Sequence, residues 1–164
     1  MVAFTIEKTI DAPVEAVFAR ASDVRSWADH IDGIERVEVL TDGPIGVGTR
    51  FRETRVIFKK EATEEMEITA FEPPRRYALT AVSCGCRYET EVTCEPEGAS
   101  GKKTVVRMTF EATPLSFVAK VMSVLMRPMM KTMVKSCARD LDDLKSSIEG
   151  TPAAPSGAST TPAR

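Results

Sequence analysis

Two spacings of apolar residues alternate along the chain and divide it into strand-forming and helix-forming segments. In residues 2–10, Phe4, Ile6 and Ile10 share one parity, which predicts a strand with one buried face. The same period of two returns after Gly33 and continues to residue 112. It predicts six further strands, over residues 34–40, 49–59, 62–71, 75–83, 86–95 and 102–112. The short breaks between them suit antiparallel connections.

Between the first and second strands the spacing becomes helical. Pro13 suits the first turn of a helix, and the apolar residues after it recur every three or four positions. A second short helix is predicted over residues 23–30. The chain therefore begins with one strand and two short helices before the run of six strands.

The last apolar pattern, from residue 115 to residue 148, is helical and rich in methionine. Pro128 lies inside it, and an interior proline costs a helix about 3 kcal/mol, so we expect a lead-in helix over 115–127 and a main helix over 128–149. Methionine is flexible, so its stripe suits either a packed core or a pocket for apolar ligands of variable shape. The stripe comprises Val118, Met122, Leu125, Met126, Met129, Met130, Met133, Cys137, Leu141 and Leu144.

These elements predict an α+β domain over residues 1–149, followed by a tail. A curved antiparallel sheet of seven strands needs cover for its apolar face, and the C-terminal helix is the largest element that could provide it. Residues 150–164 are rich in Pro, Ala, Ser and Thr without an apolar period, which predicts disorder. The length of 164 residues, with 43% hydrophobic residues, suits one globular domain.

Charge and motif content narrow the classes of function. The formal net charge of −2 indicates no general attraction to nucleic acid or to an anionic membrane. Without an export signal or eighteen consecutive apolar residues, a cytoplasmic protein with no integral membrane association is expected. Cys84 and Cys86 are too close for an ordinary secreted disulfide framework, so reduced thiols are expected. Neither a phosphate-loop nor a metal-binding pattern is present, and no metal or cofactor is predicted.

The parity of each strand predicts which side chains face the interior. Phe51 and Ile57 point inward, so Glu53 and Arg55 between them should do so as well. An inward Glu and Arg could pair or orient the polar head of a ligand. Alternatively, the strand curls and both groups reach solvent at the mouth of a cavity. The other inward positions are Glu64, Met66, Ile68, Ala70, Tyr77, Leu79, Ala81, Cys86, Tyr88, Val92, Cys94, Val106, Met108 and Phe110.

Three further side chains could carry chemistry. Tyr77 and Tyr88 could each orient a ligand carbonyl, although a tyrosine on an apolar face usually packs and finds one hydrogen-bond partner. His30, the only histidine, lies near Trp27 and could act as a general acid or base if a carboxylate were positioned beside it. A solvated surface histidine is the simpler interpretation.

Four motifs carry a resemblance to a known superfamily. They are residues 10–18 (IDAPVEAVF) with Asp23 and Trp27, the glycine turn at residues 46–49, residues 71–76 (FEPPRR) and residues 141–145 (LDDLK). In these motifs the chain resembles the START-like SRPBCC superfamily of polyketide cyclase/dehydrase and lipid-transport proteins, over residues 3–149. The resemblance implies a helix-grip fold, in which a curved seven-stranded sheet wraps around a long C-terminal helix. It does not select one function.

Three hypotheses of function follow. The first is binding of a hydrophobic or amphipathic small molecule between sheet and helix. The second, which the resemblance implies, is a cyclase or dehydratase-type enzyme acting on an apolar, polyketide-like substrate in the same cavity. The third is a protein-interaction module with a filled core. The candidate ligand-binding residues are Trp27, Phe51, Glu53, Arg55, Met66, Tyr77, Tyr88, Met108, Phe110, Val118, Met122, Met126, Met129 and Met133.

Overall fold

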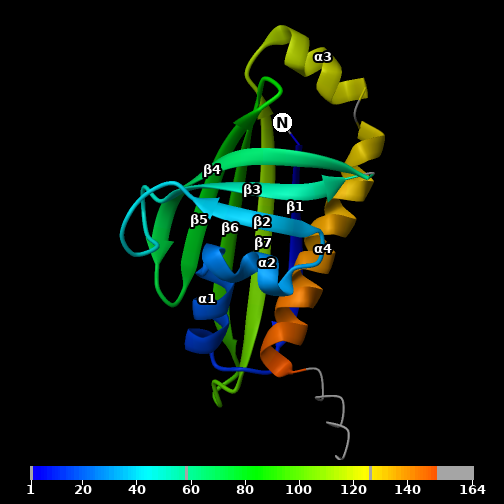
Figure 1. The fold of residues 1–164 in the computed structure, drawn as a ribbon. Coiled ribbons are helices and arrows are strands. Elements are labelled where there is room, and N and C mark those ends of the chain that lie inside the picture. The colour runs from blue at the N-terminus through cyan, green and yellow to red at the C-terminus, as the bar shows by residue number, and fades with distance from the viewer. Residues whose placement is uncertain (1, 58, 126, 151–164) are drawn as a thin grey trace, which may run out of the picture.

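A single antiparallel sheet of seven strands curves around a C-terminal helix in the computed structural model (Figure 1), which describes residues 2–57, 59–125 and 127–150. The strand order is β1-β7-β6-β5-β4-β3-β2. This is the predicted helix-grip fold, and each predicted strand is present with its ends moved by no more than two residues. The strands are β1 (Val2–Ile10), β2 (Ile34–Val39), β3 (Arg50–Ile57), β4 (Lys60–Glu72), β5 (Arg76–Ser83), β6 (Cys86–Glu97) and β7 (Lys103–Pro114).

The helices lie at the two ends of the chain, as predicted. The segment expected to form the second short helix is divided into a 3₁₀ turn and one short α-helical turn. The break expected near Pro128 falls just before it, so the proline lies in the first turn of α4, where its missing N–H costs no helical hydrogen bond. The helices are α1 (Val14–Ser22), η1 (Val24–Ser26), α2 (Trp27–His30), α3 (Phe117–Leu125) and α4 (Arg127–Glu149). The tail predicted to be disordered, from residue 151 on, lies outside the described residues.

One prediction of strand facing is wrong, at Ala70. A β-bulge between Ile68 and Ala70 shifts the register, so that Ile68 pairs with Leu79 but Phe71 pairs with Tyr77. Phe71 therefore takes the inward place expected for Ala70 and packs edge-on against Phe18 of α1, with the ring centroids 5.5 Å apart. The extra residue of a bulge inverts the alternation beyond it, which parity alone does not reveal.

The packed core lies at one end of the grip. There α1, η1 and α2 meet the sheet and the C-terminal part of α4, which contributes Leu141 and Leu144. In Figure 1, α3 lies at the opposite end of the molecule, beyond the ends of the strands. The grip is therefore packed at one end and covered at the other by a short separate helix.

Polar contacts fasten the C-terminal half of α4 along β1. Lys145 Nζ donates to the Thr9 carbonyl at 2.7 Å, and Lys8 forms an ion pair with Asp142. At the end of the helix, the Asp11 backbone N–H donates to Glu149 Oε1 at 2.8 Å. These contacts fix α4 at the β1 edge and leave the middle of the concave sheet face free of direct helix packing.

Candidate functional site

A cavity of about 1110 Å³ lies between the concave face of the sheet and α4. Inward side chains of β3 to β7 form one wall, a face of α4 forms the other, and the turn from α2 to β2 closes one side. A smaller pocket of about 110 Å³ shares Met66, Leu79, Tyr88, Phe110 and Met133 with it. The larger volume, about 1110 Å³, is of the size found in binding sites for small molecules.

Most of the predicted ligand-binding residues meet at this cavity. Phe51 does not line it, because it is fully buried behind Trp27, against which it packs edge-on with the ring centroids 5.6 Å apart. The side chains of Met122, Met126 and Met129 lie outside the described part of the chain. The predicted residues that line the cavity are Trp27, Glu53, Arg55, Met66, Tyr77, Tyr88, Met108, Phe110 and Met133.

The predicted place of Val118 in the cavity wall is wrong. Its side chain is 71% exposed and lies on α3, outside the cavity. The prediction treated residues 115–148 as one stripe, whereas α3 ends at Leu125, α4 begins at Arg127, and the two helices take different directions (Figure 1). The apolar face of α3 therefore does not continue that of α4.

The polar centre of the cavity wall is a buried cluster of three charged side chains, Glu53, Arg55 and Asp140. Arg55 Nε donates to Glu53 Oε1, while its two terminal nitrogens donate to Asp140 Oδ1 at 3.1 Å and Oδ2 at 2.8 Å. Glu53 is only 5% exposed. Of the two alternatives left open for Glu53 and Arg55, the structure shows the pairing of both residues inside the cavity wall, where the guanidinium connects β3 to α4.

Burial and ion pairing have opposite effects on the pKa values of the three groups in this cluster. Burial raises the pKa of Glu53 and of Asp140, and the neighbouring Arg55 only partly offsets it. Burial alone would lower the pKa of Arg55, but the two carboxylates outweigh it and raise that pKa, so the guanidinium stays charged. The cluster thus holds one fixed positive charge between two carboxyl groups that are harder to ionise than usual.

Sequence reasoning missed Asp140, although a signal was available. Asp140 lies three residues after Cys137 and four before Leu144, so it falls on the predicted inward stripe of α4. A carboxylate on such a stripe is almost never fully buried unless it is paired. An inward Asp opposite an inward Arg was therefore a detectable hint of an ion pair between helix and sheet.

Tyr77 has a structural partner for its hydroxyl. Its Oη donates to the Ala21 carbonyl at 2.9 Å, and Trp27 Nε1 donates to the same oxygen at 3.0 Å. Burial raises the pKa of Tyr77, so the hydroxyl keeps its proton. It holds the end of α1 against the sheet, which does not support a role in orienting a ligand carbonyl.

Tyr88 lies farther along the cavity wall. Its ring stacks on Phe110 with the centroids 5.8 Å apart, and burial raises its pKa to about 12. A neutral phenol inside an apolar wall can donate or accept one hydrogen bond. Of the two tyrosines, Tyr88 is therefore the one whose hydroxyl could serve a ligand.

His30 is not the solvated surface residue expected from the sequence. Its Nδ1 lies 2.8 Å from the Ser26 carbonyl, which can only accept, so Nδ1 carries the hydrogen and Nε2 does not. Nε2 is buried and has no hydrogen-bond partner among the described residues. Burial and nearby Arg20 lower the pKa of His30, so the ring is neutral at neutral pH.

The four cysteines are free thiols. Burial raises the pKa of Cys94 to about 12 and that of Cys137, which lines the cavity, to about 11, so both stay protonated and unreactive at neutral pH. Cys84 and Gly85 both have positive φ, of 50° and 72°, as the two-residue turn between β5 and β6 requires. In the described ranges, no group of three or more His, Cys, Asp and Glu side chains is placed to hold a metal ion.

The sequence matches a family model described as polyketide cyclase/dehydrase and lipid transport over residues 1–149. The chain belongs to this family. No curated protein sequence matches it.

Solved structures share the fold at low sequence identity. TTHA0849 from Thermus thermophilus is 22% identical with a TM-score of 0.73, over 90% of this chain and 97% of that one. Norcoclaurine synthase from Thalictrum flavum is 16% identical with a TM-score of 0.71, over 90% and 95%. The Zhui aromatase/cyclase from Streptomyces sp. R1128 is 15% identical with a TM-score of 0.68, over 90% and 93%.

Replacing Arg55 with methionine should destabilise the protein strongly, because it leaves two buried carboxyl groups without a cation. We expect the free energy of unfolding at pH 7 to fall by about 3–5 kcal/mol, measured by urea denaturation. The loss should shrink as the pH is lowered toward about 5. The two carboxyl groups already have raised pKa values in the folded state, so they take up protons there more readily than in the unfolded chain.

Arg52 provides the matched control on the same strand. It faces outward, with its side chain 50% exposed and paired only with surface glutamates. Its replacement with methionine should cost less than about 1 kcal/mol, with little dependence on pH. Equal losses for the two variants would show that the buried cluster does not stabilise the contact between β3 and α4.

Proposed function

We propose that this member of the polyketide cyclase/dehydrase and lipid transport family binds a small, mainly apolar molecule between the sheet and α4. The observation that carries the proposal is the cavity of about 1110 Å³, whose wall is largely apolar with a few polar groups. That combination is typical of ligand sites, in which apolar contact supplies affinity and a few polar groups fix orientation. Burial contributes about 25 cal/mol per Å² of apolar surface removed from water.

The charged cluster favours a particular polar end for this ligand. The two terminal nitrogens of Arg55 donate to Asp140 and its Nε donates to Glu53, so the guanidinium is poorly placed to bind an anionic ligand. Carboxyl groups outnumber cations in the cluster and in the whole cavity lining, where Asp32, Glu53, Glu64, Asp140 and Asp142 face Arg55, Lys135 and Arg139. A ligand hydroxyl or amine could donate to Glu53, whereas a ligand carboxylate or phosphate would meet like charge. The proposed ligand is therefore a neutral or cationic amphiphile.

The filled-core alternative has no support in the described residues. The inward side chains Met66, Met108 and Phe110 line the cavity of about 1110 Å³ together with Met133 of α4. A protein-interaction role would thus need a surface other than this cavity wall.

A cyclase-type enzyme is the second candidate, because one residue of the cavity wall has suitable properties. Burial raises the pKa of Glu53, and a carboxyl group tuned toward neutrality can act as a general acid or base. The structural neighbours include proteins named as aromatase/cyclases, Zhui and the di-domain StfQ. Under this proposal Glu53→Gln should abolish turnover of a polyketide-like substrate and change its binding only modestly. Equal rates for the variant and the parent would remove Glu53 from the mechanism.

Binding can be tested with N-phenyl-1-naphthylamine, a neutral apolar fluorescent probe. The parent protein should take it up with enhanced, blue-shifted emission. Ala112→Trp places an indole in the cavity wall and should weaken uptake by about tenfold or more, because the ring occupies ligand volume. Ala3→Trp on the exposed face of β1 is the control and should bind like the parent. Equal uptake by both variants would place the probe elsewhere.

The polar preference can be tested with three ligands of equal chain length. By competition with the probe at pH 7, decylamine and 1-decanol should bind about tenfold more tightly than decanoate. Glu53→Gln, which removes one ionisable carboxyl group, should narrow that difference. Tightest binding by decanoate would contradict the proposed amphiphile while leaving cavity binding itself intact.

A further inference from the structure

The α3 helix presents an apolar surface to solvent. Of its nine residues only Lys120 and Ser123 are polar. Phe117 is 80% exposed, and its apolar neighbours on the same helical face are also more than half exposed. Such a contiguous patch is unusual on a surface that contacts only water. We define the α3 patch as Leu115, Phe117, Val118, Val121 and Val124.

The orientation of α3 is fixed by contacts on its inner side. Leu115 N donates to the Gly85 carbonyl at 2.9 Å, and Ser116 Oγ caps the helix by accepting from Ala119 N at 3.1 Å. Ala119 is buried, and a Cβ atom added to Gly85 would lie 3.4 Å from the Cβ of Ala119. Ala119 of α3 therefore faces the β5–β6 turn, whereas Phe117, Val118, Val121 and Val124 are exposed to solvent.

The patch adjoins one end of the cavity. Ala119 on its inner side lines the cavity, together with Cys84 and Pro114 from the neighbouring turn and strand. This end lies opposite the packed core formed with α1 and α2 (Figure 1). A surface bound to the patch would therefore lie beside the less densely packed end of the grip.

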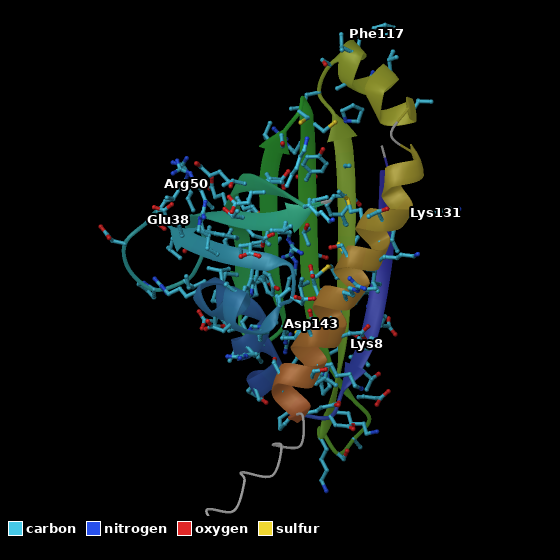
Figure 2. All side chains as sticks on the ribbon, turned by 45° about the vertical axis from the view of Figure 1, so that its right-hand side comes forward. Lys8, Glu38, Arg50, Phe117, Lys131 and Asp143 are labelled. Atoms are coloured by element: carbon cyan, nitrogen blue, oxygen red, sulfur yellow. The ribbon has the colours of Figure 1, made fainter. Side chains whose placement is uncertain are left out.

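The segment of the sequence that contains α3 and the first half of α4 differs in the sign of its charge from the whole chain. Residues 112–139 hold five of the 22 Lys and Arg residues and none of the 24 Asp and Glu residues. The net charge of −2, which predicted no attraction to an anionic membrane, conceals this basic segment. Figure 2 shows Phe117 on α3 at the top of the molecule and Lys131 lower down, on the N-terminal part of α4. Of the basic residues, Lys120 lies on α3, Arg127 and Lys131 lie in the first two turns of α4, and Lys135 and Arg139 lie farther along α4 in the cavity lining.

We propose that the α3 patch docks on the surface of an anionic lipid bilayer. An exposed apolar helix face flanked by basic residues is the composition of helices that lie in the membrane interface, where apolar side chains enter the acyl boundary and cations meet the lipid phosphates. The proposed contact is a peripheral one. No helix in the described residues is long and apolar enough to cross a bilayer. Docking places the α3 end of the cavity beside the bilayer, although it does not depend on the ligand proposed above.

Cosedimentation with vesicles tests this docking. The full chain should bind phosphatidylcholine vesicles that contain phosphatidylglycerol, and added salt or omission of phosphatidylglycerol should weaken binding. Val118→Asp should lower the partition coefficient by about tenfold, because it replaces an inserted apolar group with an anion. Val47→Asp is the control, since Val47 is equally exposed, at 69% against 71%, but lies in the loop between β2 and β3.

A second variant covers the case in which Val118→Asp fails to fold. Phe117→Trp keeps the patch apolar, and its indole should show blue-shifted emission on anionic vesicles, above the constant signal of buried Trp27. Absence of binding by the parent protein, or equal binding by the Val118 and Val47 variants, would overturn the proposal. A dimer in light scattering that Val118→Asp dissociates would also overturn it, because a second copy would then cover the patch.

Discussion

The guanidinium of Arg55 is the contact on which the geometry of the cavity depends. It reaches from the middle of β3 to Asp140 on α4 and also holds Glu53 of its own strand. Removing three charged groups from water is costly, and only their mutual pairing offsets that cost. The helix is thus connected to the concave face by a polar bridge at a place where close apolar packing would eliminate the cavity.

The remaining elements divide the molecule into a packed end and an end that α3 covers. At the packed end, Leu141 and Leu144 enter the core while Lys145 fastens α4 to β1. Toward the other end, the cavity wall consists of flexible or aromatic side chains such as Met133 and Phe110. In the proposed binding mode the polar end of a ligand meets the charged cluster, and its apolar body extends toward α3.

Much of this fold could be predicted because each signal was local. Alternating residues gave seven strands, and the parity of Phe51 placed Glu53 and Arg55 on the inner face correctly. The errors arose where one local change alters everything beyond it. Because of the bulge after Ile68, Phe71 faces inward at the position expected for Ala70. Because α3 and α4 are separate helices with different directions, Val118 faces solvent. The inward place of Asp140 could be read from the stripe of α4, but its partner Arg55 lies 85 positions away, and local spacing does not reveal that pairing. The sequence could not predict the volume of the cavity, because helix-grip folds with a filled core and with an open cavity have the same alternation of apolar and polar residues.

The most direct test of a ligand held between sheet and helix is methyl NMR of methionine during titration with a neutral apolar ligand such as 1-decanol. Met66 and Met108 line the cavity from the sheet, and Met133 lines it from α4. The three methyl signals, assigned by single replacement with leucine, should shift together with one dissociation constant. Saturable binding that leaves all three signals unchanged would contradict a binding site between the sheet and α4.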